Sequence, residues 1–412
     1  MRNQRRPTHP MLIAIAALMT VALAAIPRLL KAAQQPPVAA AGFAINDFGL
    51  RLLSTLRAGH ETENTIISPV SVAMALEMIY NGAAGNTYLA MGQTLRVTNL
   101  GDSINPLNQE LLKTIKDADP SVEIAIANAL WAQKGFKIAP DFIEKTKAYY
   151  GARIRSLNFE GDPDGANAMI NRWVDKATKG KIPTIIEKPD PHARLVVTDA
   201  VYFKGKWSWP FPKGATATRD FNTADGGAIK TPMMRLEHDF GYLENDDFQA
   251  VRLPYGNQSF AMYVLLPKKQ TGLAGMVSKL NEVKWRQWGE RFVNREGTVV
   301  LPKFKLTYQA QLNDPLRKMG MDVAFSDEAD FSRVNPSAAL KITDVEHRTF
   351  IKVDETGTEA AAATSVSIIA TAVRREPPPF EMIIDHPFFL AITEGESGAM
   401  LFAGVVTNPA AK

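Results

Sequence analysis

The spacing of apolar residues predicts several helices in the first half of the chain. Apolar side chains recur at helical intervals over residues 43–56 and stop at Gly59, which is typical of an amphipathic helix. Ser68 followed by Pro69 provides a capping residue and a proline suited to the first helical position, so a second helix is expected from there to Gly82. Two more helices are expected over residues 140–150 and 166–178.

Short apolar and β-branched runs between turn residues predict strands, most of them in the second half. Residues 123–131 are strand-like, and the apolar run 195–203 suits a strand buried on both faces. The later strands are expected over residues 250–253, 260–266, 297–304, 350–353, 388–393 and 400–405, with breaks at Pro254, Gly256, Pro267 and Gly398. Helices grouped early and strands grouped late favour an α+β fold with large antiparallel or mixed sheets.

The N-terminus has the pattern of an export signal. Arginines precede an uncharged apolar run, residues 11–26, and small residues follow it. Because that run is short for a bilayer span, we favour a cleaved signal over a retained membrane anchor for residues 1–33. No Cys follows the run, which excludes a lipoprotein anchor. Residues 34–42 are expected to form a short tether and residues 43–412 a single domain, secreted or periplasmic.

The composition narrows the function classes. The 412 residues include 47 Lys and Arg against 43 Asp and Glu, a formal charge of +4. Removing residues 1–33 removes five basic residues and no acidic one, so the remaining chain is nearly neutral and no nucleic-acid partner is expected. The absence of Cys excludes a disulfide scaffold, a thiolate metal site and a Cys nucleophile. The 46% of hydrophobic residues is ample for a large core.

Motifs for catalysis are missing from the sequence. It contains no nucleophile elbow, phosphate loop, dinucleotide fingerprint or zinc-protease motif, and its six His residues have no metal-ligand spacing. A hydrolase with carboxylates far apart in the chain is a weak alternative. We therefore expect neither an enzyme nor a bound cofactor or metal.

One segment, residues 355–379, fits neither an ordinary loop nor a core strand. It is too apolar for an exposed loop and too long for one strand, and it ends in two arginines and three prolines. Alternate positions nevertheless share one face of small or β-branched residues: Thr358, Ala360, Ala362, Thr364, Val366 and Ile368. Because a pleated strand buries every second side chain, this segment can lie outside as a loop and also fit into a sheet.

The motifs around this segment identify the chain as a member of the serpin family. The run DETGTEAAAAT at residues 354–364 resembles the hinge of serpins, and other serpin-like motifs follow one another in order over some 360 residues. They are Ile67-Ser68-Pro69, Asn128-Ala129, Ile170-Asn171, Gly180-Lys181-Ile182, Tyr202-Phe203-Lys204-Gly205-Lys206-Trp207, Leu253-Pro254-Tyr255, Leu301-Pro302-Lys303-Phe304, Ala329-Asp330-Phe331-Ser332, His386-Pro387-Phe388 and Leu401-Phe402-Ala403-Gly404.

The resemblance implies a fold of three β-sheets and about nine helices with an exposed reactive-centre loop. A serine protease attacks that loop, forms its acyl-enzyme and is trapped when the cleaved loop inserts into the central sheet. The hinge residues carried over are Glu355, Gly357, Thr358, Glu359, Ala360, Ala361, Ala362 and Ala363. Thr358 is the first inward residue and Glu359 faces outward, so the composition favours an inhibitor. A non-inhibitory binding or carrier protein is the alternative.

The position of the cleaved bond determines the target protease. Counting about seventeen residues from Glu355, as the family usually does, places the bond at Thr371–Ala372, which suits an elastase-like or subtilisin-like protease. The next bond, Ala372–Val373, is a close alternative. Cleavage after Arg374 or Arg375 would instead recruit a trypsin-like protease, with an inserting arm three or four residues longer.

The resemblance also places Ser68, Ser71 and His347 in the polar region where the central sheet opens, and Trp207 near the point where insertion begins. The chain departs from the family at Asp199, where Asn is usual. We expect Asp199 to pair with His347 and to make sheet opening more pH-sensitive. Residues 92–114 hold only two basic residues, Arg96 and Lys113, so no heparin site is expected, and the protein is expected to be a monomer.

Overall fold

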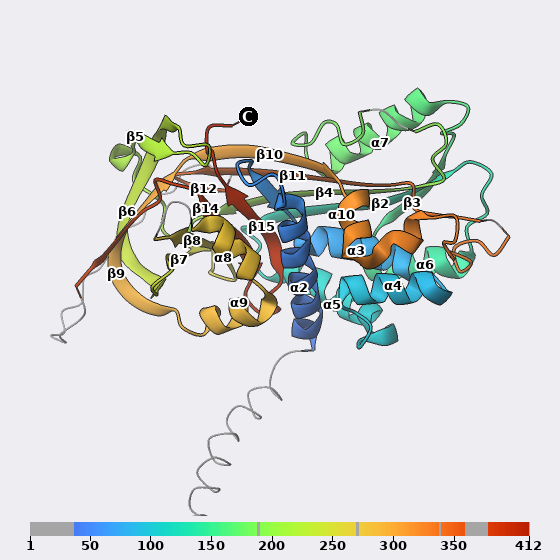
Figure 1. Cartoon of the computed structure of the whole chain (residues 1–412), viewed down its shortest axis with the longest axis horizontal. Coiled ribbons are helices and arrows are strands. Elements are labelled where there is room, and N and C mark those ends of the chain that lie inside the picture. Colours follow the sequence, from blue (N-terminus) through green and yellow to red (C-terminus); the bar gives the residue numbers. More distant parts are fainter. Residues whose placement is uncertain (1–36, 188–189, 269–271, 338, 359–377, 412) are drawn as a thin grey trace, which may run out of the picture.

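The computed structural model describes residues 37–187, 190–268, 272–337, 339–358 and 378–411. It is an α+β molecule in which nine α-helices of the described chain pack around two large sheets (Figure 1). The helices are α2 (Val38–Arg57), α3 (Pro69–Tyr80), α4 (Gly85–Leu95), α5 (Ile104–Asp117), α6 (Pro140–Tyr150), α7 (Pro163–Ala177), α8 (Leu273–Lys279), α9 (Glu282–Gly289) and α10 (Asn313–Leu316).

The four predicted helices are present, although two of them begin earlier than expected, α2 and, at Pro163 instead of Ala166, α7. α3 begins where the Ser68–Pro69 pair predicts, and the Ser68 side chain accepts a hydrogen bond from the Ser71 N–H as its N-terminal cap. α2 begins five residues earlier than expected, at Val38. Val38 is fully buried, so residues 38–42 belong to this helix and its packing rather than to a tether.

The strands form sheets of nine and six members. The larger sheet has the order β1-β15-β14-β8-β7-β6-β9-β13, with β5 paired to β6, and the smaller one has the order β10-β11-β12-β4-β2-β3. The strands are β1 (Thr65–Ile67), β2 (Glu123–Gln133), β3 (Arg153–Leu157), β4 (Leu195–Lys206), β5 (Ala217–Asn222), β6 (Ala228–Glu244), β7 (Phe248–Tyr255), β8 (Phe260–Pro267), β9 (Val293–Pro302), β10 (Phe304–Gln311), β11 (Asp344–Asp354), β12 (Gly357–Thr358), β13 (Phe380–Ile383), β14 (Phe388–Glu394) and β15 (Met400–Val406).

The third sheet expected from the resemblance is not separate in the structure. The long strand β6 joins its strands to the rest of the nine-stranded sheet. One edge of β6 pairs first with β5 and then, over its last four residues, with β7, while its other edge pairs with β9. The group β5, β6, β9 and β13 is therefore hydrogen-bonded continuously to the group that ends in β1.

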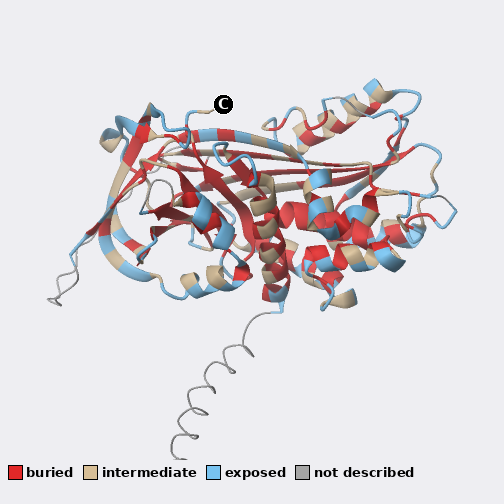
Figure 2. Ribbon diagram, in the orientation of Figure 1, coloured by how far each residue is buried: buried red, intermediate tan, exposed pale blue. Residues whose placement is uncertain are grey.

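Strand β4 of the six-stranded sheet is buried on both faces, as its apolar run predicts. Alternate residues of β4 belong to two separate hydrophobic clusters, Val197 and Val201 to the main core and Val196 and Ala200 to the smaller one. α7 covers the smaller cluster, whereas α3 lies in the main core on the opposite face (Figures 1 and 2). A side chain of β4 thus faces either α7 or α3.

Pro254 is the clearest error in the strand predictions, because it lies inside β7 instead of ending a strand. β7 pairs with β6 only over residues 249–252, so beyond Arg252 that edge of β7 is free of β6. A proline is tolerated at such an edge because no partner strand needs its missing N–H. The Pro254 carbonyl accepts a hydrogen bond from the Ser208 N–H at 2.9 Å.

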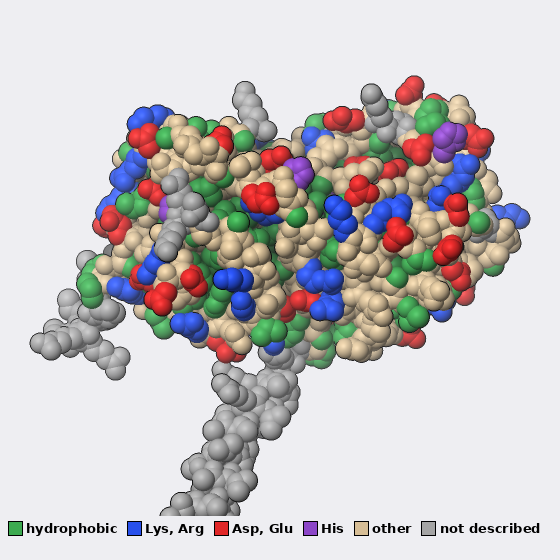
Figure 3. All heavy atoms as spheres, in the orientation of Figure 1, with side chains coloured by type: hydrophobic (Ala, Val, Ile, Leu, Met, Phe, Trp, Pro, Cys, Tyr) green, Lys and Arg blue, Asp and Glu red, His purple; other side chains and the backbone are tan. Residues whose placement is uncertain are grey.

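The surface and the helices add two observations. Acidic and basic side chains are interspersed over the face seen in Figure 3, without a broad area of one sign. Among the described residues, no helix combines the length and apolar character needed to cross a bilayer.

Candidate functional site

The candidate site is the place where β4 and β11 separate. The two strands pair in parallel from Asp344 opposite Val196 to Phe350 opposite Tyr202. Beyond that pair β12 lies between them, with Thr358 opposite Val353 of β11 and Gly205 of β4. The first residues of the hinge, Gly357 and Thr358, thus fill the gap between β4 and β11 as a two-residue strand.

Thr358 faces inward, as the alternation of the hinge predicts. It is 1% exposed, and its hydroxyl shares a hydrogen bond of 2.7 Å with the hydroxyl of Tyr255. Tyr255 is itself fully buried, and this burial raises the pKa of its phenol. The position therefore accepts a small hydroxyl-bearing side chain and has no room for a solvated charge.

Gly357 allows β12 to approach β4. Its φ of 149° lies in the region that favours glycine, and a Cβ at this position would lie 2.1 Å from the carbonyl oxygen of Gly205. Any side chain here would push β12 out of the gap.

Glu355 and Trp207 hold the segment just before β12. Lys303 forms an ion pair with Glu355 at 2.8 Å, and the Thr216 hydroxyl donates to the same carboxylate at 2.9 Å. Burial acts to raise the pKa of Glu355, but the hydrogen bonds from Lys303, from its own backbone and from Thr216 outweigh it and leave that pKa below its usual value. The Trp207 indole stacks on Tyr255 and donates to the Asp354 carbonyl at 2.9 Å.

The predicted sheet-opening residues form one buried cluster beneath β4 and β11. Asn128 of β2, Asp199 of β4 and His347 of β11 stand in register across three adjacent strands. His347 Nδ1 contacts Asp199 Oδ1, and the backbone N–H of Ser68 donates to His347 Nε2 at 3.2 Å. Because Nε2 accepts this bond, the ring proton lies on Nδ1 and points at Asp199. The expected Asp199–His347 contact is therefore present, with Asp199 Oδ2 unpartnered in the described structure.

Ser71 completes the cluster through Asn128. Its hydroxyl donates to Asn128 Oδ1 at 3.1 Å, and Asn128 Nδ2 donates back to the Ser71 carbonyl at 3.1 Å. The start of α3 is thereby bonded to β2 through Ser71 and to β11 through Ser68. Parting β4 from β11 would disturb both connections.

Comparison with known proteins decides the family. The model of the serpin family, described as serine protease inhibitors, matches residues 43–409. The chain belongs to the serpin family. An uncharacterised serpin-like protein of Thermococcus kodakarensis is 37% identical over 387 residues, 92% of this chain and 88% of that protein. The leukocyte elastase inhibitor of Sus scrofa is 32% identical and covers 88% of this chain and 97% of its own length.

Solved serpin structures agree with the fold. Human thyroxine-binding globulin in complex with its hormone superimposes with a TM-score of 0.83 at 25% identity, over 91% of this chain and all of the other. Serpins are mostly protease inhibitors and not enzymes, and the leukocyte elastase inhibitor is a relative of this chain named as an inhibitor.

The sequence identified only part of this serpin's site. Tyr255 and Lys303 lie in serpin-like motifs from which the sequence predicts no role, although they bind Thr358 and Glu355. Their place in those motifs was the only available signal. Glu359, Ala360 to Ala363 and every candidate reactive bond, from Thr371–Ala372 to Arg375–Glu376, lie outside the described residues.

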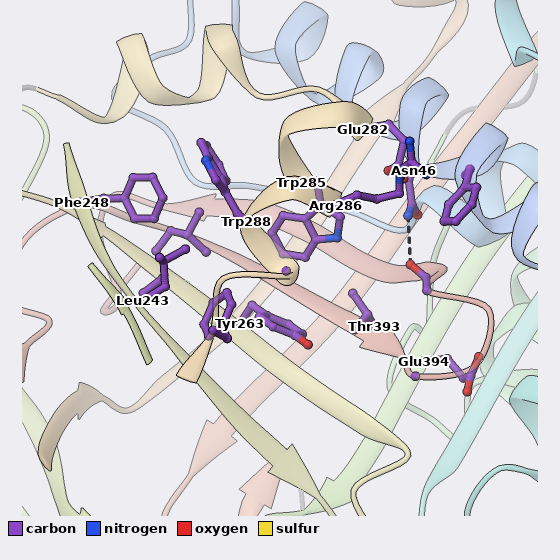
Figure 4. Close-up of a pocket in the computed structure, with 17 residues that line it drawn as sticks. Asn46, Leu243, Phe248, Tyr263, Glu282, Trp285, Arg286, Trp288, Thr393 and Glu394 are labelled. Atoms are coloured by element: carbon purple, nitrogen blue, oxygen red, sulfur yellow. Dashed lines mark hydrogen bonds and ion pairs between the residues drawn. The ribbon is translucent and has the colours of Figure 1, made fainter. Parts of the chain in front are cut away.

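A second candidate site is a small aromatic pocket between α2, α9 and the nine-stranded sheet (Figure 4). Its cavity measures about 140 Å³. Six aromatic residues line it: Phe43, Phe248, Tyr263, Trp285, Trp288 and Phe292. Within the described residues, no group of three His, Asp or Glu side chains could hold a metal ion, in this pocket or elsewhere.

Glu282 is the unusual polar residue of this pocket. Neither of its carboxylate oxygens has a hydrogen-bond partner in the described structure, and the Arg286 Nε lies 3.5 Å away. The nearby Asn46 amide is already bonded to the Gly398 carbonyl and the Met400 N–H. Burial raises the pKa of Glu282 to about 8, although Asn46 and Arg286 act in the opposite direction. The pocket thus combines aromatic walls with an unsatisfied carboxyl group.

Proposed function

We propose that this serpin is a suicide-type inhibitor of serine proteases. The observation that carries the proposal is β12, which already fills the gap between β4 and β11 with its inward Thr358 buried. The hinge sequence after it continues with small residues, which can follow β12 into the sheet without burying a charge.

Insertion after cleavage provides the driving force. Each further residue that joins β12 gains ladder hydrogen bonds to β4 and β11, which must release their direct pairing below Phe350 and Tyr202. A protease that is still esterified to the loop moves with it. If its active site is distorted before water attacks the acyl bond, the enzyme remains trapped.

The experiment mixes the purified protein with elastase, subtilisin, chymotrypsin and trypsin and looks for a complex that survives denaturing electrophoresis. The same proteases with a chemically blocked serine are the control, because they cannot form the ester. We expect a complex only with an active protease. Cleavage without any complex would overturn the proposal and favour the carrier alternative.

Within this proposal, the reactive bond is Thr371–Ala372 and the target is elastase-like or subtilisin-like. The similarity to an elastase inhibitor supports this choice without deciding it. Mass spectrometry of the C-terminal fragment released from the complex tests it. A fragment starting at Arg375 or Glu376 would instead identify a trypsin-like target.

Export is a separate proposal, resting on the charge and apolar pattern of residues 1–33. Expression of the full chain in a bacterium, followed by cell fractionation and N-terminal sequencing, tests it. We expect a shortened protein outside the cytoplasm. A full-length protein in the membrane fraction would identify an anchor instead.

A second candidate function is small-molecule carriage, favoured by the pocket around Glu282. A structural relative binds thyroxine, an aromatic molecule, and the aromatic side chains that line this pocket suit such a ligand. Calorimetric titration with thyroxine as the probe tests it, with Trp288→Ala as the variant that removes a wall. We expect binding that weakens at least about tenfold in the variant, the loss of one aromatic contact. No binding to the wild type would dismiss this function.

A further inference from the structure

A buried carboxyl group lies where the helices α3, α5 and α6 meet. Glu77 of α3 is fully buried and accepts a hydrogen bond of 2.5 Å from the Asn108 Nδ2 of α5. Asn108 also contacts the hydroxyl of Tyr150 in α6 at 3.4 Å. In the part of the chain that the structure describes, no Lys, Arg or His is bonded to Glu77, and Tyr150 is the titratable group that faces it.

The two groups that meet here each leave one atom without a partner. Glu77 Oε1 and Asn108 Oδ1 are both buried acceptors that have no hydrogen-bond partner in the described structure. Two acceptors cannot bond to each other, but a proton on the carboxyl group makes one of them a donor. A single proton therefore satisfies both atoms, and the acid and the amide then share two hydrogen bonds in one ring.

We propose that the protonated carboxyl group of Glu77 and the amide of Asn108 form a pair of hydrogen bonds that holds α5 against α3. This pair is released as the pH rises and the proton is lost. The pair lies on the helix whose first turn holds the sheet-opening cluster through Ser68 and Ser71. Release would therefore loosen the support of that cluster. This device is independent of the target protease.

The electrostatics agree with a neutral carboxyl group. Burial raises the pKa of Glu77 from 4.5 to about 8, although the Asn108 bond acts in the opposite direction. Burial, and then the charge of Glu77, raise the pKa of Tyr150, so the phenol stays neutral in the same pH range. Around pH 7 the carboxyl group keeps its proton.

The sign of the pH effect follows from the two pKa values. In the closed state the Glu77–Asn108 pair is formed, and in the open state it is broken and the carboxyl group is in water. Below about pH 4.5 both states hold the proton, and the closed state is favoured most strongly. Between about 4.5 and 8 the closed state keeps a proton that the open state has lost, so each pH unit favours opening by about tenfold. Above about pH 8 both states are ionised and the effect levels off.

Glu77→Gln tests the proposal, since a glutamine amide can form the same two hydrogen bonds at every pH. The measurement is amide hydrogen exchange in α5, with the wild type and this variant compared at equal pH. We expect the ratio of their opening constants to rise about tenfold per pH unit from pH 6 to 8. The matched control is Glu110→Gln, which removes an exposed carboxylate from the same helix. Its exchange should follow that of the wild type.

A second measurement covers the case in which Glu77→Gln does not fold. Carbon-13 NMR of labelled Glu carboxyl groups should show a titration near pH 8 that is displaced in Asn108→Ala, because that change removes the amide that contacts the Glu77 carboxyl group. Parallel exchange profiles for wild type and Glu77→Gln would overturn the proposal. So would carboxyl resonances that are all unaffected by Asn108→Ala.

Discussion

Two neighbouring residues set the conditions under which the gap between β4 and β11 can be filled. Gly357 lets the backbone pass the Gly205 carbonyl, and Thr358 places a small hydroxyl against Tyr255. Neither residue could be enlarged without moving β12, because backbone lies on one side and a buried aromatic ring on the other. In the proposed mechanism, insertion of the loop would start from this position.

Thr358→Arg should convert the protein from inhibitor to substrate. A guanidinium in place of the buried hydroxyl must be desolvated at a cost of several kcal/mol, which slows insertion while cleavage continues. The stoichiometry of inhibition should rise several-fold, measured by titrating a fixed amount of protease. Thr358→Ser keeps the hydroxyl and should inhibit like the wild type. An unchanged stoichiometry in the arginine variant would contradict a role for this residue.

Asp199→Asn should change how stability and inhibition rate depend on pH between 5 and 8. The substitution replaces the carboxylate that His347 Nδ1 contacts by a neutral amide and leaves the Ser68 bond to Nε2 in place. Thermal denaturation and inhibition kinetics across that range measure the difference. In a His347→Gln background the same substitution should have no pH-dependent effect. Superimposable profiles of wild type and Asp199→Asn would refute the idea.

At the scale of elements, the sequence predicted best where local chemistry determines the structure. Ser68 and Pro69 marked the start of α3 because a cap and a proline act within one turn. Pro254 misled because its place in β7 depends on where β6 stops pairing, which no local pattern reveals. The same limit applies to Glu77, which looks like an exposed helical residue until α5 and α6 cover it.

The residues of the sheet-opening cluster were predicted from the resemblance, but most of the hydrogen bonds between them were not. Asp199 and His347 are far apart in the chain, and only the parallel register of β4 and β11 brings them together. The contact of Lys303 with Glu355 depends on a similar encounter between distant segments. Long-range pairing of this kind cannot be read from periodicity.

Exchanging the charges of Glu355 and Lys303 should show how strongly this pair holds the end of β11. Glu355→Lys and Lys303→Glu should each lower the melting temperature, and the double variant should recover part of the loss. Because Lys303 is about one-third exposed, we expect a coupling energy of only about 1 kcal/mol from a double-mutant cycle. Additive effects of the two single substitutions would contradict this role.

The same ion pair has a predictable pH dependence. The pKa of Glu355 is lowered, so its contribution to stability is present above the ordinary carboxyl range and is lost as the pH falls through the lowered value. The coupling energy should therefore vanish in acid. A coupling that is equal at pH 7 and at about pH 3 would indicate a packing effect instead of an ion pair.

On the scale of the whole molecule, the two-residue strand β12 interrupts the direct pairing of β4 with β11 in the six-stranded sheet, and the proposed mechanism requires this sheet to accept a longer strand there. The chain contains no Cys, so no disulfide restrains that sheet or its loop. Packing and hydrogen bonds alone resist opening, chiefly the parallel pairing of β4 with β11 and the cluster around His347. Separating these strands is the main cost of insertion.

Cleavage of the loop should therefore make the protein more stable, provided that the loop enters the sheet. About ten inserted residues would add ladder hydrogen bonds worth roughly 0.5–1.5 kcal/mol each, which corresponds to a rise in melting temperature of at least about 10 °C. Calorimetry before and after limited cleavage measures this rise, and hydrogen exchange should show stronger protection of β4 and β11. Cleaved Thr358→Arg protein should gain much less, because its hinge resists entry. If cleaved wild-type protein melts at the same temperature as the intact form, the loop does not insert, and trapping of a protease by this chain would have no driving force.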